Sequence, residues 1–158
     1  MKKESKNFAF HKIKIDDIKL ILKKRPIDSH KRTFGHALMI SGSKGMMGAC
    51  VLSSEAILRS GAGLLTIYTP KAGELIVQTS IPEAMVIVDS NEDHIQNFPD
   101  LSKYSAIGVG PGIGTASETK NAIADFINHV SIPTVFDADG LNIISQNKEL
   151  LQHIPHES

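Results

Sequence analysis

The sequence predicts an α/β protein with a mainly parallel sheet. Short apolar runs recur along the chain, and segments with helical spacing separate most of them. Two of the corners between a strand and the next helix are rich in glycine. Because strands and helices that alternate in this way form βαβ units, their strands pair in parallel. We expect five strands, in a sheet that is incomplete toward the carboxyl end of the chain.

Length and composition indicate a single domain without a nucleic-acid partner. The chain has 158 residues, and its 17 Lys and Arg residues balance 17 Asp and Glu residues. This balance, without a basic stripe, argues against nucleic acid. The chain lacks a signal-peptide core and any long apolar run, so we expect no membrane segment. Cys50, the single cysteine, excludes an internal disulfide and favours the cytoplasm, and we interpret it as a small buried thiol.

The amino-terminal part is expected to contribute little to the fold. Residues 1–14 are polar and basic without periodicity, which predicts a disordered or linker-like lead-in to a domain at 15–158. Residues 15–24 have apolar side chains at helical spacing and predict a short helix. The loop 26–35 contains a His-Lys-Arg triplet at 30–32, which is either a solvated charge cluster or a contact to the phosphates of a ligand.

The first glycine-rich corner has the composition of a phosphate site. Residues 37–40 form a short apolar run, Gly42, Gly45 and Gly48 follow, and a helix is predicted at 49–60. Glycine lets backbone amides approach a ligand closely, and a helix start presents unpaired N–H groups to an anion. The spacing matches neither the nucleotide P-loop nor the Rossmann fingerprint. The alternative is that these glycines only form a tight turn.

The next segment completes a βαβ unit and adds a third strand. Residues 64–69 are apolar and β-branched, as in a buried parallel strand. Residues 71–80 are predicted to be helical, and residues 84–89 form the third strand. We interpret residues 91–103 as a polar surface connection.

The second glycine-rich corner repeats the order of the first. A strand is predicted at 106–109, and a Gly-Pro-Gly-Ile-Gly loop at 110–114 follows it directly. Thr115 and Glu118 have the spacing of a capping box, and apolar residues at i, i+3, i+4 and i+7 predict the helix that follows. Because ligands bind beyond the carboxyl ends of the strands in an open parallel sheet, we expect both glycine loops to converge on one site.

The fifth strand leads into an acidic corner. It is predicted at 133–137, with Asp137 at its end and Asp139 as the N-cap of the next helix. At the mouth of a parallel strand, Asp137 could bind a ribose hydroxyl or hold Mg²⁺ against a phosphate. One pair of carboxylates does not identify a metal, so we assign no metal ligand.

In this order, the motifs resemble those of the ATP/ADP-dependent NAD(P)H-hydrate dehydratases, a family with a ribokinase-like fold. The resemblance covers residues 15–158. It implies a three-layer α/β/α domain, repair of hydrated NADH and NADPH, ATP or ADP as the phosphate donor, use of Mg²⁺, and a homo-oligomer. The motifs that carry it are Gly42-Ser43 with Gly48-Ala49, Gly61-Ala62-Gly63-Leu64, Pro82-Glu83-Ala84, Gly110-Pro111-Gly112-Ile113-Gly114 and Asp137-Ala138-Asp139-Gly140-Leu141-Asn142.

The resemblance also implies a mechanism and a binding site. In the family, a nucleoside phosphate donor activates the hydroxyl added to the nicotinamide ring, and loss of phosphate restores the reduced dinucleotide. Ala49 and Gly112 match positions that contact the hydrated dinucleotide. The other residues expected to bind substrate are Gly48, Gly110, Gly114, Asp137 and Asn142.

The sequence departs from the family pattern in two places. The family loop before the first strand usually reads His-Lys-Gly, whereas residues 30–32 read His-Lys-Arg. The expected nucleotide loop and the Gly-Thr-Gly-Asp motif with the catalytic base lie beyond Ser158, so we expect this chain alone to be inactive. Two alternatives stay open: a ribokinase-like kinase of sugar or vitamin alcohols, and a non-catalytic nucleotide-binding module.

Overall fold

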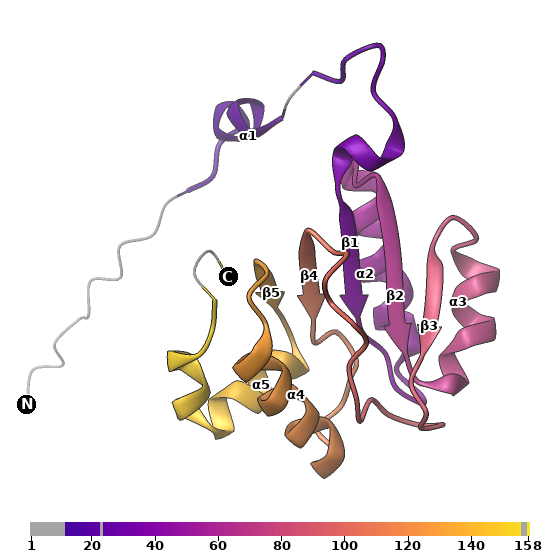
Figure 1. The fold of residues 1–158 in the computed structure, drawn as a ribbon, viewed down its shortest axis with the longest axis vertical. Coiled ribbons are helices and arrows are strands. Elements are labelled where there is room, and N and C mark those ends of the chain that lie inside the picture. Colours follow the sequence, from indigo (N-terminus) through magenta and orange to yellow (C-terminus); the bar gives the residue numbers. More distant parts are fainter. Residues whose placement is uncertain (1–11, 23, 156–157) are drawn as a thin grey trace, which may run out of the picture.

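Five parallel strands form a sheet in the order β3-β2-β1-β4-β5 in the computed structural model, which describes residues 12–22, 24–155 and 158 (Figure 1). Every neighbouring pair runs parallel. The predicted five-stranded parallel sheet is therefore confirmed. The strands are β1 (His36–Ile40), β2 (Leu64–Thr69), β3 (Met85–Val88), β4 (Ala106–Val109) and β5 (Thr134–Phe136).

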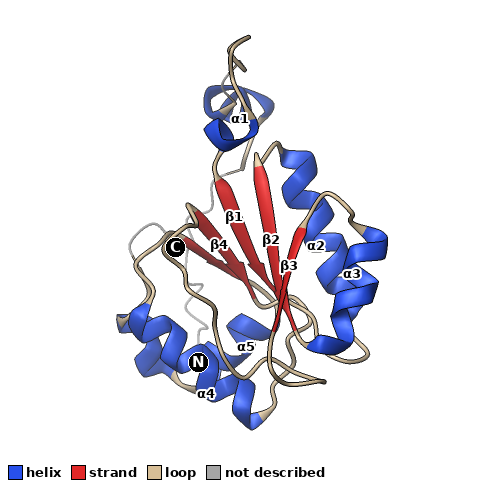
Figure 2. Cartoon of the chain, turned by 45° about the vertical axis from the view of Figure 1, so that its right-hand side comes forward, coloured by secondary structure: helices blue, strands red, loops and turns tan. Residues whose placement is uncertain are grey.

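Helices cover both faces of this sheet and make three layers. Figure 2 shows α2 and α3 on one side and α4 and α5 on the other. The predicted α/β/α architecture is thus confirmed. The α-helices are α1 (Ile15–Ile21), α2 (Met47–Ser60), α3 (Glu74–Ser80), α4 (Ser117–His129) and α5 (Asp139–Gln146), and the short 3₁₀ helices are η1 (Lys31–Phe34), η2 (Lys71–Gly73) and η3 (Lys148–Gln152).

The core is divided between the two faces of the sheet by the alternation of strand side chains. Leu38 and Ile40 of β1 pack in the cluster that includes α4 and α5, whereas Met39 packs in the cluster with α2 and α3. Cys50 belongs to the second cluster, where burial raises the pKa of its thiol. The interpretation of Cys50 as a buried thiol is confirmed.

The strand order contains a reversal that positions the ligand site. The chain runs from β1 outward through β2 to β3, and then returns to the other side of β1 to form β4 and β5. The connections after β1 and β4 therefore leave in opposite directions at the carboxyl ends of adjacent strands. In open parallel sheets, the crevice at such a reversal is the usual place for a ligand.

Two helix starts differ from the sequence prediction. α2 begins at Met47 rather than at residue 49, so Gly48 lies in its first turn and not in the preceding loop. α4 begins at Ser117 with Ala116 as its N-cap, so the predicted capping box of Thr115 with Glu118 is wrong. The second glycine loop is longer than its glycines indicate, because Thr115 continues the loop.

The amino-terminal helix lies apart from the sheet. α1 is shorter than the predicted 15–24 and projects beyond the amino end of the sheet, where none of its residues is buried (Figure 1). Most of the expected lead-in at 1–14 falls outside the described residues. Among the helices that the structure describes, none is long and apolar enough to cross a bilayer.

Candidate functional site: two glycine loops at the carboxyl end of the sheet

The first glycine loop (residues 41–46, after β1) and the second (residues 110–116, after β4) are hydrogen-bonded to each other. The Gly42 N–H donates to the Pro111 carbonyl at 2.9 Å, and the Ser43 hydroxyl donates to the Gly112 carbonyl at 2.8 Å. The residues joined by the Ser43 bond are 69 positions apart in the sequence. The predicted convergence of the two loops is confirmed.

Gly112 lies at the tightest point of this junction. Its φ is +67°, and a Cβ atom there would come within 2.7 Å of the Met46 carbonyl oxygen and 3.0 Å of the Ala49 Cβ. Both values are shorter than ordinary contacts, so only glycine fits without a shift of the backbone. The structure therefore brings Ala49 and Gly112 together, and it gives Gly112 a packing role in addition to any contact with a ligand.

The start of α2 is open to an anion. Its N-cap, Met46, makes no side-chain hydrogen bond to the helix, and its first turn contains no acidic residue. A Cβ atom on Gly45 or Gly48 would meet nothing within 4 Å, so the backbone here is accessible. Unpaired N–H groups and the positive end of the helix dipole favour negative charge at such a position. The start of α2 therefore has the geometry of a phosphate-binding helix terminus.

The second glycine loop is held from its other side by α5. Asp139 accepts hydrogen bonds from the Gly114 N–H at 3.0 Å and from the Asn142 side-chain amide at 3.1 Å. Asp139 is the first residue of α5, so its prediction as the N-cap is wrong. The N-cap is Ala138, whose φ of +46° is unusual for a residue other than glycine. Asp139 positions the loop, and Asn142 stays exposed beside it.

Asp137 and Gly110 lie where β5 and β4 end. A Cβ atom on Gly110 would collide with the Asp137 carbonyl oxygen, which requires glycine at this crossing. The Asp137 side chain is exposed and lines a groove of about 450 Å³ between α2 and the β4–β5 part of the sheet. Among the described residues, no cluster of three or more His, Cys, Asp or Glu side chains could hold a metal ion.

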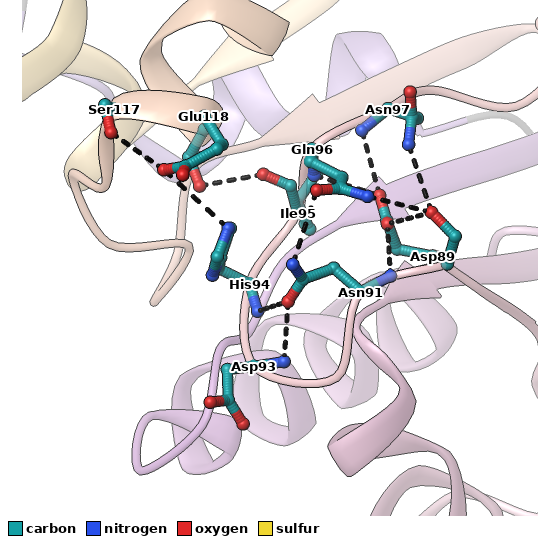
Figure 3. A network of polar contacts seen from close by, with 11 residues as sticks. Asp89, Asn91, Asp93, His94, Ile95, Gln96, Asn97, Ser117 and Glu118 are labelled. Atoms are coloured by element: carbon teal, nitrogen blue, oxygen red, sulfur yellow. Dashed lines mark hydrogen bonds and ion pairs between the residues drawn. The ribbon is translucent and has the colours of Figure 1, made fainter.

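The connection after β3 lies at the surface, but a network of hydrogen bonds around Asp89 orders it. Asp89 is 1% exposed and accepts hydrogen bonds from the N–H groups of Asn91, Gln96 and Asn97, at 2.8 to 3.0 Å (Figure 3). It also accepts a hydrogen bond from the Tyr68 hydroxyl at 2.9 Å. Within the same connection, Ile95 is completely buried. The predicted surface connection at 91–103 is confirmed for every residue except Ile95, and its polar side chains also bind the backbone of their own loop.

This loop also contacts both glycine-rich corners. Lys44 of the first glycine loop donates its N–H to the Asp93 carbonyl at 2.8 Å and pairs with the Asp93 carboxylate at 2.9 Å. On the other side, the Thr119 hydroxyl in α4 donates to the Ile95 carbonyl at 2.8 Å. Residues 89–97 therefore form a wall that joins the first glycine loop to the start of α4.

The charge state of Asp89 follows from these bonds. Burial alone would raise the pKa of its carboxyl group, but three backbone N–H groups and the Tyr68 hydroxyl favour the carboxylate, and the net effect lowers the pKa. Burial and the neighbouring Asp89 carboxylate raise the pKa of Tyr68. Asp89 is thus an ionised acceptor that the sequence shows only as the last residue of an apolar strand.

The His-Lys-Arg triplet at 30–32 lies at the opposite end of the sheet. It leads into η1 and then into the first residue of β1, whereas the glycine loops follow the last residues of β1 and β4. A strand the length of β1 separates the two ends by roughly 13 Å. The triplet therefore does not adjoin the glycine loops, and a contact between it and the phosphates of a ligand stays a prediction.

Comparison with known proteins identifies the family. Residues 37–157 match the family model described as NAD(P)H-hydrate dehydratase. The bifunctional NAD(P)H-hydrate repair enzyme Nnr of Coxiella burnetii is 35% identical over 127 residues, which cover 80% of this chain and 25% of that enzyme. The ADP-dependent (S)-NAD(P)H-hydrate dehydratase of Lactiplantibacillus plantarum is 33% identical over 125 residues, which cover 78% of this chain and 44% of that enzyme. The chain spans less than half the length of these relatives.

Solved structures agree with this result. An ADP/ATP-dependent NAD(P)H-hydrate dehydratase from Bacillus subtilis, co-crystallised with ATP/Mg²⁺, is 29% identical with a TM-score of 0.65, covering 80% of this chain and 45% of that one. A ribokinase-like superfamily protein from Enterococcus faecalis is 26% identical with a TM-score of 0.68, covering 79% of this chain and 44% of that one. The ribokinase-like fold is confirmed, and the chain belongs to the NAD(P)H-hydrate dehydratase family.

Proposed function

We propose that this chain is the dinucleotide-binding part of an enzyme that dehydrates (S)-NAD(P)H-hydrate to NAD(P)H with ATP or ADP as the phosphate donor. The observation that carries the proposal is the junction of the two glycine loops, where Gly112 packs on Ala49 at the strand-order reversal. A pyrophosphate binds where backbone N–H groups at the start of a helix can be approached closely, and the junction provides such a helix start. The reaction is the one for which the related enzymes are named.

In the proposed complex, the residues around the junction have different roles. The start of α2, with Gly48 in its first turn, would receive the negative charge of the pyrophosphate. Gly110 and Gly114 would shape the second loop, which Asp139 holds through the Gly114 N–H. Asp137 and Asn142 are exposed beside this loop, so they are the residues we assign to the ribose hydroxyls.

The phosphate donor and Mg²⁺ need groups in addition to those of this site. Asp139 already accepts two hydrogen bonds, which leaves Asp137 as the exposed carboxylate at this corner. One carboxylate is not a protein cage for Mg²⁺, although Mg²⁺ often binds through one carboxylate together with substrate phosphates. The described residues therefore do not define a site for the ion, and we derive no step of the reaction through it.

We propose that the catalytic base and the donor-binding loop belong to a part of the enzyme not covered by these 158 residues. Binding the dinucleotide without stabilising the transition state does not accelerate the reaction. The chain alone is therefore expected to bind hydrated NADH weakly and not to dehydrate it. Incubation with hydrated NADH, ATP or ADP and Mg²⁺, followed by the absorbance of restored NADH, tests this. Turnover above the spontaneous rate would assign the base to this chain.

We also propose a homo-oligomer and a cytoplasmic location. The groove beside Asp137 is lined mainly by apolar residues of α2, β4 and β5, and Val135 on β5 is 69% exposed. An exposed apolar strand at a sheet edge favours association. Light scattering of the chain and of Val135→Lys would test this, because the lysine should reduce the mass if β5 is in the interface. The proposed location is supported by the free thiol of Cys50.

Binding at the junction is tested most directly with a charge in the first turn of α2. Ala49→Asp places a carboxylate next to Gly112, where it should repel the pyrophosphate while the helix dipole accommodates it. We expect affinity for hydrated NADH, measured by calorimetry, to fall roughly tenfold or more. Ala56→Asp is the matched control, since it adds the same charge two turns later on an exposed position of α2.

Two outcomes would contradict the proposed site. If Ala49→Asp and Ala56→Asp weaken binding equally, the effect is general repulsion and the junction is not the site. If sugar or vitamin alcohols bind more tightly than hydrated NADH, the site belongs to a small-molecule kinase. In both cases, circular dichroism should first establish that the variants remain folded.

A further inference from the structure

We propose that the amino end of the sheet contains a second ligand site, which takes a small organic phosphate in a basic cavity lined by Lys31, Arg32 and Lys103. The cavity has a volume of about 690 Å³ and also includes His36 and Tyr104. It lies at the first residue of β1, whereas the glycine loops follow the last. The inference does not depend on the function proposed for those loops.

The charges in this cavity are not neutralised within the protein. Lys31, Arg32 and Lys103 line it, and no carboxylate does. None of the three forms an ion pair with any residue that the structure describes. The Lys103 cation contributes to lowering the pKa of the nearby Asp100, but Asp100 is not part of the lining. Three cations without ion-pair partners that line one concave surface attract a multiply charged anion.

The backbone that carries Lys31 and Arg32 is fixed to the sheet. A Cβ atom on Gly63 would collide with the Lys31 carbonyl oxygen, so η1 packs directly on the segment before β2. The Leu64 N–H donates to the Gly35 carbonyl at 3.1 Å and the Gly63 N–H donates to the Phe34 carbonyl at 3.1 Å. The two basic side chains therefore extend from a turn that strand pairing holds in place.

The opposite wall is fixed in the same way. The Ser105 hydroxyl accepts from the His36 N–H at 2.9 Å, and the Ser105 N–H donates to the His36 carbonyl at 2.9 Å. Next to Ser105, the Tyr104 ring packs edge-on against the His36 ring with centroids 4.8 Å apart, and Lys103 Nζ lies 5.3 Å from the Tyr104 centroid. Lys103 is thus directed over an aromatic surface that is itself anchored to β1.

The lining defines the class of ligand. Besides the three cations, the cavity includes Leu64 and Met85, and the Met85 side chain is 45% exposed. A ligand that contacts both the basic and the apolar side chains of the cavity has a phosphate for the cations and an apolar or planar group for Leu64, Met85 and Tyr104. The cavity volume falls within the range of small-molecule sites. An organic phosphate fits this description better than inorganic phosphate alone.

Phenyl phosphate is a suitable probe, with phenol and inorganic phosphate as its two parts. Titration of the isotope-labelled chain, followed by NMR, should give saturable shifts at His36 and Ser105. The pKa of His36 is lowered by burial and by Lys103, so a bound anion should raise it. Phenyl phosphate should bind more tightly than either part, and the amides of Gly42 and Gly112 should not respond.

Variants test two of the three cations, Arg32 and Lys103. Arg32→Gln and Lys103→Gln are exposed changes that should leave the fold intact and should each weaken phenyl phosphate binding roughly fivefold or more. Lys148→Gln is the control, because it removes an exposed positive charge from η3. The proposal would be overturned if the NMR shifts were confined to the glycine loops or did not saturate. It would also be overturned if Lys148→Gln lost as much affinity for phenyl phosphate as Arg32→Gln and Lys103→Gln.

Discussion

The two ends of the sheet hold a ligand by different means. At the carboxyl end, the glycine loops and the start of α2 offer backbone N–H groups, and the geometry depends on conformations that glycine permits. At the amino end, the cavity offers the side chains of Lys31, Arg32 and Lys103. The comparison teaches that substitutions at the carboxyl end should change folding and binding together, whereas substitutions of cavity cations should change binding alone.

The largest effect is expected from Asp89→Asn at the carboxyl end. Asparagine keeps one acceptor oxygen, so its NH2 group must face donors that now bind a carboxylate oxygen. These donors are the Asn91 N–H at Oδ1, or Tyr68, Gln96 and Asn97 at Oδ2. Because these donors are partly or fully buried, the free energy of unfolding should fall by about 3 kcal/mol. Urea denaturation measures it. Asp100→Asn is the control, since exposed Asp100 accepts only from Ser102 and should cost less than about 1 kcal/mol.

The loss of stability caused by Asp89→Asn should depend on pH. The pKa of Asp89 is lowered from its ordinary value of 3.8, so its ionised form stabilises the fold at every pH above that value. The contribution is lost as the pH falls through the lower pKa of the folded protein. The difference in unfolding free energy between the wild type and Asp89→Asn should therefore be constant near neutral pH and shrink in acid. A difference that grows in acid would reverse the assigned sign.

A smaller loss is expected from Gly112→Val. The valine must adopt a φ of +67° and its Cβ meets Met46 and Ala49, so the free energy of unfolding should fall by about 2–3 kcal/mol. Gly45→Val separates the two causes, because Gly45 has a φ of +86° but nothing within 4 Å of its Cβ. If Gly112→Val lowers stability and the folded fraction keeps its affinity for hydrated NADH, Gly112 has only a structural role.

The smallest effect is expected at the amino end, from Ser105→Ala. The change removes the hydroxyl that accepts from the His36 N–H and donates to the His36 carbonyl at 3.2 Å, in an exposed position. Thermal denaturation should show a loss of about 1 kcal/mol. A loss as large as that of Asp89→Asn would break the comparison, because the amino end would then be as important for folding as the carboxyl end.

Much of this architecture follows from local sequence. Apolar runs and helical spacing predict the five parallel strands, because each strand depends on neighbouring residues. The meeting of the two glycine loops follows from the shared strand-to-helix polarity of their corners. The role of Asp89 does not follow from local sequence, because its hydrogen-bond partners range from Tyr68 to Asn97, across an irregular loop. Its signals were the Asx residues that follow, which bind nearby backbone. Of the basic cavity, only the triplet at 30–32 could be singled out, because Lys31 and Lys103 line one cavity only after β1, β2 and β4 have paired.

The two hydrogen bonds between the glycine loops have a consequence for motion. Both are donated by the first loop and accepted by the second, at Pro111 and Gly112. Neither corner can open without releasing the other, so the loops should fluctuate as one cooperative unit. In hydrogen exchange, a compound that touches only the start of α2 should then slow the amides of both loops by the same factor. The amides of the loop after β4 would then exchange more slowly when a ligand binds that this loop does not contact.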